Sequence, residues 1–405
     1  MYPVSSAWRS LRFGKAILLI ASVVLAACQA APTPTLEPTQ PPDPTPIPPT
    51  ATPLIQIEAS PMPEEGLTAT PYPVYGPTDY PPTVNPLTGL EVSDPEVLNR
   101  RPLLIKVSNE SETVRPQSGL SFADHVWMYQ MEGWGQTRFT AVYYSQAPEF
   151  VGSVRSVRLI DTDHLIHMYD GLLVISGGSV GMGTIIRYAE WNNRVFMDNG
   201  PWLERIPDIP HEGMYGYHSL FARPDQVWAE AERRGVNQRP HLEGLVFSYA
   251  VPEGGLPTDE AIINYPGKGA RQRWVYDAAS GRWLSFTTME NAAQPQETPD
   301  RDYITGEQLA FDNVVFLFAE FYLADFIEDM PNQLLSIGPI LSGEGKAWLM
   351  RDGQRFAITW RSDGKKMLRF YDAEGNPIAF KPGTTWFNVA SVREDQYPPE
   401  VSFVP

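Results

Sequence analysis

Residues 151–181 read VGSVRSVRLIDTDHLIHMYDGLLVISGGSVG, and this stretch decides the fold of the first half of the chain. It carries two arginines three residues apart, then a segment rich in Asp and His, then an apolar run that ends in the glycine-rich sequence GGSVG. Its pattern predicts a strand, a helix, a strand and a helix, in that order, at residues 154–160, 161–169, 172–176 and 183–191. We expect much of any functional site to lie here.

The segments on either side continue the same alternation. Residues 101–108 (RPLLIKVS) predict a buried strand, and residues 123–131 and 138–145 predict a hairpin closed by the short loop EGWGQT. Residues 224–234 predict a helix, because Pro stands in its first turn, acids come early, bases come late and a Gly follows. Residues 83–239 are therefore predicted to form an α+β (or α/β) N-terminal domain.

From about residue 240 the pattern changes to short, aromatic-rich strand segments separated by Gly-containing turns. This pattern is typical of an antiparallel β domain. Residues 240–405 are therefore predicted to form a β-rich, mostly antiparallel C-terminal domain. We interpret its Trp and Tyr residues as core and ordinary sheet aromatics, with a glycan-stacking face as the alternative.

The N-terminus has the features of a bacterial lipoprotein signal. Basic residues precede a largely apolar run at 16–27, which is shorter than the roughly 20 residues that span a bilayer. The run ends in LAAC, which resembles a lipobox, so we expect cleavage before Cys28 and a diacylglycerol on its thiol. Residues 1–27 are then a signal peptide, and Cys28 anchors the protein to the extracytoplasmic face of the cell membrane. A plain secretory signal is the alternative.

Residues 28–82 are predicted to be a disordered tether. Between positions 32 and 53, 10 of 22 residues are Pro, interleaved with Thr. Such a composition cannot bury a core and favours extended polyproline II, which acts as a semi-rigid spacer. We expect it to hold the globular part away from the membrane.

Charge and cysteine content exclude several classes of function. The formal charge is −17, and it becomes −20 once residues 1–27, with three cations and no acids, are removed. A strongly acidic protein is a poor binder of nucleic acid, so no nucleic-acid partner is expected. Cys28 is the only cysteine, which excludes internal disulfides, thiol catalysis and Cys-based metal sites.

Short motifs spread along the chain resemble the YerB-like lipoprotein family. They are NPLTG at 85–89, RPQSGL at 115–120 with AD at 123–124, TRF at 137–139, GSVRSVR at 152–158, GGS at 177–179, PH at 210–211, NVV at 313–315, GEG at 343–345 and PGTTW at 382–386. The resemblance covers roughly residues 83–395. It implies a lipobox, a tether, an N-terminal domain and a β-rich C-terminal domain, and no known activity.

Two positions depart from the family pattern. Relatives read Gly-Pro-Val-Arg-Ser and Pro-His-Asn, where this chain has Ser153 in place of the Pro and Glu212 in place of the Asn. A carboxylate next to His211 would alter any role that this histidine has in relatives.

Four arginines in or beside these motifs predict an anion site. They are Arg115, Arg138, Arg155 and Arg158. Guanidinium groups offer a rigid fork of donors suited to phosphate or carboxylate, and we expect the Gly177, Gly178 and Ser179 amides and His211 to complete the pocket. The alternative is ordinary ion pairing with acids near in the sequence, namely Asp124, Glu132, Asp161 and Asp163.

The sequence Gly177-Gly178-Ser179-Val180-Gly181 also matches the G-x-S-x-G nucleophile elbow of serine hydrolases. His211 or His218 would then be the base, oriented by Asp208 or Asp225. Ser179 and His211 are thus weak catalytic candidates. A tight turn, or a helix start that binds an anion, is the competing interpretation.

Metal and cofactor signals are weak. His164 and His167 are spaced to share one helical face near two aspartates, but no HExxH and no Cys partner accompany them. Phosphate-loop, Rossmann and EF-hand patterns are missing from the sequence. We therefore predict no metal and no cofactor.

Together these features predict a lipid-anchored, extracytoplasmic cell-envelope protein that binds an anionic envelope ligand or an envelope protein and is not an enzyme. The alternative is an enzyme acting on envelope polymers, either a Ser179 hydrolase or an arginine-assisted phosphotransferase.

Overall fold

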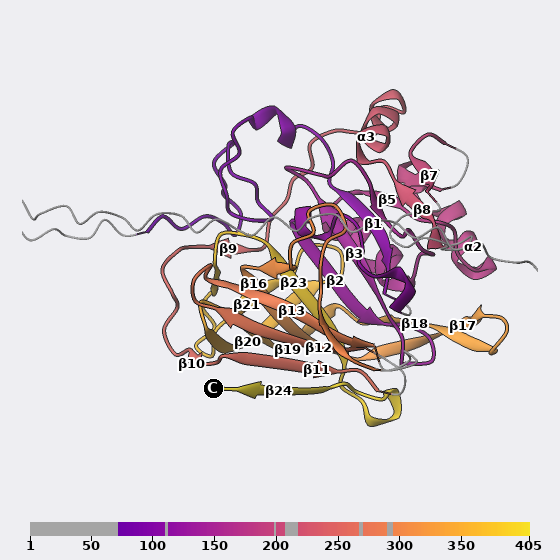
Figure 1. The fold of residues 1–405 in the computed structure, drawn as a ribbon. Coiled ribbons are helices and arrows are strands. Elements are labelled where there is room, and N and C mark those ends of the chain that lie inside the picture. Colours follow the sequence, from indigo (N-terminus) through magenta and orange to yellow (C-terminus); the bar gives the residue numbers. More distant parts are fainter. Residues whose placement is uncertain (1–71, 110–111, 198–199, 207–217, 267–269, 290–294) are drawn as a thin grey trace, which may run out of the picture. The chain divides into compact units, whose positions relative to one another are not determined.

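The largest β-sheet of the computed structural model contains eleven strands and runs through both halves of the chain (Figure 1). The structure describes residues 72–405 apart from 110–111, 198–199, 207–217, 267–269 and 290–294. All of these residues belong to one compact unit, Thr68–Pro405. The predicted signal peptide, Cys28, His211 and most of the tether lie outside the described residues.

Strands from before residue 240 form one end of this sheet, and strands from after it form the other. The first set is β1 (Leu103–Ser108), β2 (His125–Gln130), β3 (Thr137–Tyr143), β5 (Leu172–Val174) and β6 (Val195–Phe196). The second set is β10 (Leu256–Pro257), β16 (Asn313–Ala319), β19 (Ser342–Arg351), β20 (Gln354–Asp363), β21 (Arg369–Tyr371) and β23 (Thr385–Ser391).

The two sets meet at β2. On one side β2 pairs antiparallel with β3, as the predicted hairpin requires, and on the other it pairs parallel with β23. Strands β1, β2, β3 and β23 are buried along their whole length, so their polar residues as well as their apolar ones lie inside the protein. The predicted boundary at residue 240 therefore separates two parts of the sequence that share one sheet.

A second sheet covers one face of the first. Its strands are β11 (Glu260–Asn264), β12 (Ala270–Asp277), β13 (Arg282–Met289), β14 (Glu297–Pro299), β15 (Ala310–Phe311) and β24 (Glu400–Val404). Alternate residues of β12 and β13 are buried, and Trp274 of β12 packs on Trp386 of β23 with ring centroids 5.3 Å apart. The C-terminal half is accordingly β-rich and mostly antiparallel.

Among the described residues, α-helices are few and lie before residue 240. They are α1 (Ile166–Met168), α2 (Val180–Tyr188) and α3 (Pro224–Arg233), with a π-helical turn η4 (Asp161–Leu165) leading into α1. Short 3-10 turns are η1 (Pro95–Leu98), η2 (Glu112–Val114), η3 (Leu120–Phe122), η5 (Asn192–Arg194) and η7 (Glu394–Gln396). With its mixed parallel and antiparallel strands, the part of the chain before residue 240 is α+β with a low helical content.

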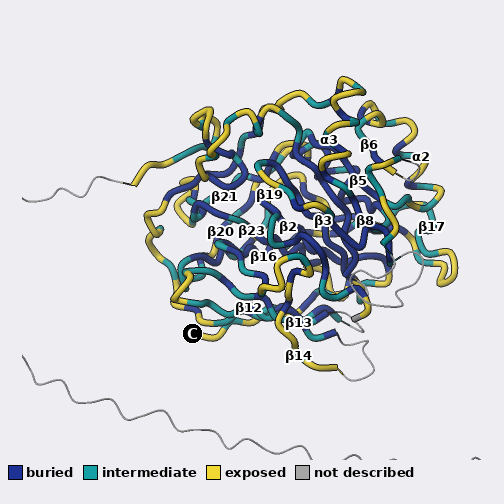
Figure 2. Tube along the Cα trace, turned by 45° about the horizontal axis from the view of Figure 1, so that its top comes forward, coloured by how far each residue is buried: buried dark blue, intermediate teal, exposed yellow. Residues whose placement is uncertain are grey.

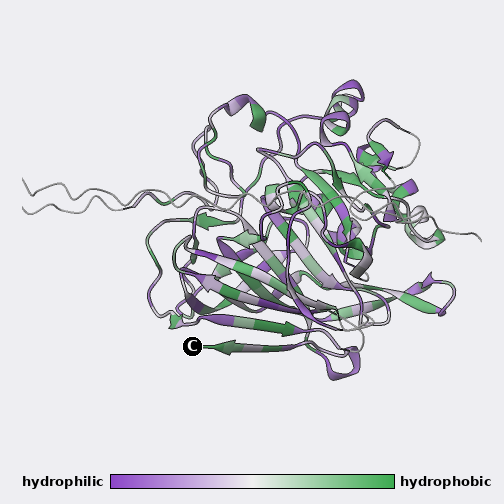
Figure 3. Cartoon of the chain, viewed as in Figure 1, coloured by the Kyte–Doolittle hydropathy of each residue, from purple (hydrophilic) through white to green (hydrophobic). Residues whose placement is uncertain are grey.

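Small strand pairs complete the fold. They are β17 (Phe321–Asp329) with β18 (Leu334–Pro339), β9 (Val246–Phe247) with β22 (Ala379–Phe380), and β4 (Val151–Gly152) and β7 (Leu203–Arg205) on either side of β8 (Leu220–Ala222). Figure 2 shows the central strands as buried and the connecting loops as exposed, and Figure 3 shows hydrophobic residues on the central strands and hydrophilic ones on α3.

Two predicted elements of residues 151–191 need correction. The predicted strand at 154–160 is wrong: β4 ends at Gly152, Val154 forms only an isolated bridge with Val107, and Leu159 and Ile160 lead into the helical turn η4. The predicted helix at 183–191 begins three residues earlier, because the Ser179 side chain caps its N-terminus. It ends at Tyr188.

Candidate functional site

Family-like motifs that are far apart in the sequence meet where the chain leaves β1. Residues 152–157 cross this strand end, and their backbone joins three other segments. The hydrogen bonds run from Ser108 N to Ser153 O (2.9 Å), from Arg155 N to Lys106 O (3.0 Å), from Ser118 N to Gly152 O (2.9 Å) and from Val157 N to Gly177 O (2.9 Å). The structure therefore brings the segments around Arg115, Arg155 and Gly177 to one end of the sheet.

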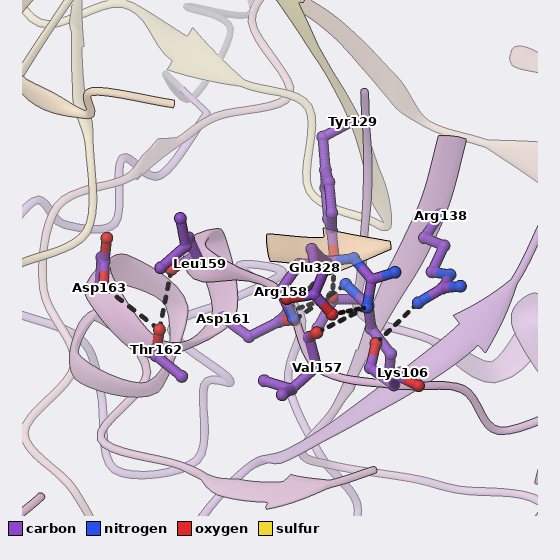
Figure 4. Close-up of polar contacts among 12 residues, drawn as sticks. Lys106, Tyr129, Arg138, Val157, Arg158, Leu159, Asp161, Thr162, Asp163 and Glu328 are labelled. Atoms are coloured by element: carbon purple, nitrogen blue, oxygen red, sulfur yellow. Dashed lines mark hydrogen bonds and ion pairs between the residues drawn. The ribbon is translucent and has the colours of Figure 1, made fainter. Parts of the chain in front are cut away.

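A fully buried ion pair lies beneath this crossing (Figure 4). Lys106 of β1 and Asp161 of η4 are both completely buried, and the lysine Nζ lies 2.8 Å from Asp161 Oδ2. Thr140 and Tyr129 donate to the other oxygen, Oδ1, at 2.6 and 3.2 Å. Burial lowers the pKa of Lys106 to about 7, and the contact with Asp161 opposes that shift. The Asp161 carboxylate therefore stabilises the positive charge of Lys106, which the apolar surroundings disfavour.

Arg158 is held by two carboxylates beside this pair. Its guanidinium forms a two-point contact with Glu132 and lies 3.1 Å from an oxygen of Glu328 of β17. Burial alone would raise the pKa of Glu132, but the Arg158 charge outweighs it and the pKa is lowered. Arg158 is only 6% exposed, so its donors serve the interior of the protein.

The other three predicted arginines have different surroundings. Arg115 pairs with Asp300 from the second sheet and donates to Asn109. Arg138 is buried and donates to the carbonyl of Ser156 at 3.1 Å. Arg155 is half-buried, and its backbone forms hydrogen bonds with β1 and with the segment that follows β5. The guanidinium groups of Arg115 and Arg158 are therefore paired with carboxylates inside the protein.

Of the acids predicted as alternative partners of the arginines, Glu132 pairs with Arg158. The other acids have different contacts. Asp124 accepts from Asn85 and from the Tyr144 amide, and burial raises its pKa to about 6. Asp163 contacts the Tyr322 hydroxyl. Neither pairs with one of the four arginines.

The glycine–serine turn forms the start of α2. Gly177 adopts a positive φ of 125°, and its carbonyl accepts the Val157 amide proton. A Cβ on Gly178 would lie 2.9 Å from Met182 and Val157 side-chain atoms, so close packing requires glycine there. The Ser179 hydroxyl accepts from Met182 N and donates to Glu328 Oε2 at 2.8 Å. These are the contacts of a helix cap tied to a neighbouring strand.

The remaining hydrolase candidates lie apart from Ser179 or outside the described residues. His211 and Asp208 belong to the undescribed segment 207–217, and Asp225 lies in the first turn of α3. Among the described residues, the contacts of the Ser179 side chain are with Met182 and Glu328.

Replacing Ser179 with alanine is expected to lower the free energy of unfolding by about 1 kcal/mol, the usual cost of losing a helix N-cap. Ser179→Thr keeps the hydroxyl and should stay close to wild type. Urea unfolding measures the stability of both variants. If the alanine variant unfolds like wild type but loses labelling by a fluorophosphonate, Ser179 is a nucleophile and the cap assignment is wrong.

The two histidines considered as metal ligands have separate environments. Both ring nitrogens of His164 lie within 2.9 Å of backbone carbonyls, of Gly364 and Pro339. His167 is half-buried and packs edge-on against Trp191. Within the described ranges, no three His, Cys, Asp or Glu side chains gather closely enough to hold a metal ion.

Sequence reasoning missed a groove on the main sheet. Its volume is about 920 Å³, and its lining includes Phe318, Ile340, Lys346, Trp348, Ala357 and Trp360. Three carboxylate residues, Glu320, Glu344 and Asp372, also line it. The alternation of exposed and buried residues in KAWLMR and QRFAITWR was the available signal, because every second residue of a strand points to the same face.

Comparisons with known proteins agree with the motifs. Residues 87–237 match the family described as "Protein of unknown function (DUF3048) N-terminal domain", and residues 261–387 match its C-terminal domain. The Bacillus subtilis (strain 168) protein named "Putative lipoprotein YerB" is 28% identical over 300 residues, which span 73% of this chain and 83% of that protein.

The fold also resembles a solved structure. The crystal structure of the YerB protein from Bacillus subtilis superposes with a TM-score of 0.61 at 24% identity, covering 79% of this chain and 99% of that one. In the part of the chain that the structure describes, no helix has the length and apolar character needed to cross a bilayer. The two domain matches and the shared motifs show that this chain, which matches both the N-terminal and the C-terminal DUF3048 domain, belongs to the YerB-like family.

Proposed function

We propose that this chain is a lipid-anchored protein of the extracytoplasmic face of the cell membrane, and that it binds a segment of an envelope protein in the groove around Trp348. The lipid on Cys28 and the tether of residues 28–82 are inferred from the sequence, and the similarity to a putative lipoprotein of Bacillus subtilis supports the lipid. The groove is the observation that carries the binding function.

The groove suits a polypeptide segment in size and lining. A volume of about 920 Å³ lies near the upper end of the roughly 300–1,000 Å³ typical of ligand pockets. Ala357 of β20 is exposed, Trp348 opposite it on β19 is partly buried against Phe403 of β24, and Ile340, which also lines the groove, is 39% exposed. Exposed apolar surface bounded by polar residues is a common mark of a protein contact.

Charge favours a cationic partner over an anionic ligand. Glu320, Glu344 and Asp372 outnumber Lys346 along the groove, and the whole chain carries a formal charge of −17. At the other candidate site, carboxylates already pair with Arg115 and Arg158. We therefore infer an extended segment with apolar and Lys or Arg residues.

The enzyme alternative has less support from the geometry. The Ser179 hydroxyl is engaged as a helix cap and with Glu328. A phosphotransferase would need arginines directed at a phosphate, whereas Arg158 is buried against two carboxylates.

Selection of short random peptides on the full chain tests the proposal. We expect selected peptides to be rich in apolar and basic residues. Ala357→Arg, which places a cation in the groove, should weaken their binding by roughly tenfold or more, as measured by calorimetry. The matched control is Ala278→Arg in the exposed turn between β12 and β13, which should bind like wild type. Equal binding by the Ala357→Arg variant would refute the assignment.

A further inference from the structure

A second, smaller pocket lies where the β2–β3 loop meets the far end of β17. Its volume is about 420 Å³. The side chains that line it include Glu132, Trp134, Gln136, Asp329, Asn332 and Tyr397. The loop comes from the first half of the chain, while Asp329 and Asn332 belong to the β17–β18 hairpin, which projects at the right of Figure 1.

The two aromatic residues of this pocket are held by one buried amide. Gln130 Nε2 donates to the carbonyls of both Trp134 and Tyr397, each at 3.1 Å. Gln130 Oε1 in turn accepts the Ser391 amide proton at 3.1 Å. These hydrogen bonds of Gln130 link the backbone on both sides of the pocket to the end of β23.

Both aromatic residues adopt a backbone conformation that bulky residues avoid. Trp134 has a φ of 63° and Tyr397 a φ of 48°, in the left-handed region that favours glycine. Non-glycine residues kept in this region tend to gather at functional sites, because surrounding structure must hold them there. Trp134 also packs edge-on against Phe321, while Tyr397 remains 60% exposed. The pocket therefore has two aromatic residues with fixed backbones, and the side chain of one of them, Tyr397, is open to solvent.

The charge of the pocket is negative. Its lining residues include two carboxylates and no Lys, Arg or His among the part of the chain that is described. Glu132 shares Arg158 with Glu328, so that group of three side chains carries one net negative charge. Asp329 accepts only from the backbone and side-chain amides of Asn332 and has no cationic partner within the described ranges. Among the described residues, a ligand that enters the pocket therefore meets two aromatic residues and a carboxylate with no cationic partner.

We propose that this pocket binds an organic ammonium group. A cation beside Trp and Tyr rings gains from their negative faces, and this pairing is the known basis of ammonium recognition by aromatic residues. The Asp329 carboxylate adds a direct charge contact. A lysine side chain of a protein and an amino substituent of an envelope polymer present the same chemistry. This site is separate from the groove around Trp348 and does not depend on the function proposed for it.

Calorimetric titration of the full chain with choline tests the proposal, with 3,3-dimethylbutanol as the neutral probe of the same shape. Choline is expected to bind and the neutral probe is not. Asp329→Asn should weaken choline binding about tenfold, which corresponds to the upper range of such contacts. The matched control is Asp325→Asn, which removes an exposed carboxylate from the same strand outside the pocket and should bind choline like wild type.

A second variant tests the aromatic contact. Tyr397→Asn removes the ring but tolerates the left-handed backbone, so it should fold and lose most of the choline affinity. Titration with Nα-acetyl-lysine amide and with D-alanine methyl ester then distinguishes the two sources of the ammonium group. The probe that binds more tightly indicates the source. The proposal is overturned if no ammonium probe binds, if the neutral probe binds as well as choline, or if Asp325→Asn and Asp329→Asn have equal effects.

Discussion

Replacing Asp161 with alanine is expected to lower the free energy of unfolding by roughly 3–5 kcal/mol, the usual cost of leaving one member of a buried ion pair without its partner. The carboxylate accepts from Lys106, Thr140, Tyr129 and the Arg158 amide. All four donors would lose a partner inside a protein region without solvent. The midpoint of urea unfolding measures the loss.

The control for this prediction removes both charges. Lys106→Met alone should also destabilise the protein, because the Asp161 carboxylate would remain buried and unpaired. The double variant Lys106→Met/Asp161→Leu should be more stable than the sum of the two single losses implies, since the two groups are in contact. Strict additivity would show that the pair is not coupled and would contradict the network described for Lys106.

Replacing Trp386 with alanine is expected to cost roughly 3–5 kcal/mol, as large-to-small changes of buried aromatic residues do. Trp386 is 1% exposed on β23 and lies between Phe139 of the first half and Trp274 and Phe311 of the second sheet. Its ring centroid is 5.0 to 5.3 Å from theirs. The side chain therefore joins both parts of the sequence in one core.

Whether the protein unfolds in one transition or in two is as informative as the midpoint of urea unfolding. Because β23 pairs directly with β2, both halves should unfold together in wild type and in the Trp386→Ala variant, when followed by circular dichroism and by tryptophan fluorescence. Trp386→Phe keeps a ring in the core and should lose much less stability. Two separate transitions, with only the C-terminal half affected, would show that residues 240–405 are an independent domain.

Local patterns predicted the elements whose contacts are close in the sequence. The hairpin of β2 and β3, the buried strand β1 and the helix α3 all follow from turn residues, apolar runs and helix-end signals. The segment 154–160 misled the same reasoning. Its Val and Ile residues favour a strand. Its amides, however, bond to isolated carbonyls of Lys106 and Gly177, and Leu159 and Ile160 enter the core at the start of η4.

The site could be predicted only in part for a related reason. The motif segments were expected to be important, and the structure brings them to one end of the sheet. What they contact depends on residues far along the chain: Glu328 reaches Arg158 and Ser179 from β17, and Asp300 reaches Arg115 from the second sheet. No local pattern carries information about such long-range pairing. The groove was missed because it needs β16, β19 and β20 side by side.

Hydrogen–deuterium exchange of the full chain, with and without a peptide selected on it, tests the central claim most directly. The account predicts slower exchange of backbone amides in β19 and β20, whose outward residues line the groove, and unchanged exchange in residues 151–181. Slower exchange confined to residues 151–181, with β19 and β20 unaffected, would contradict the account and return the binding site to the segment of Arg155 and Arg158.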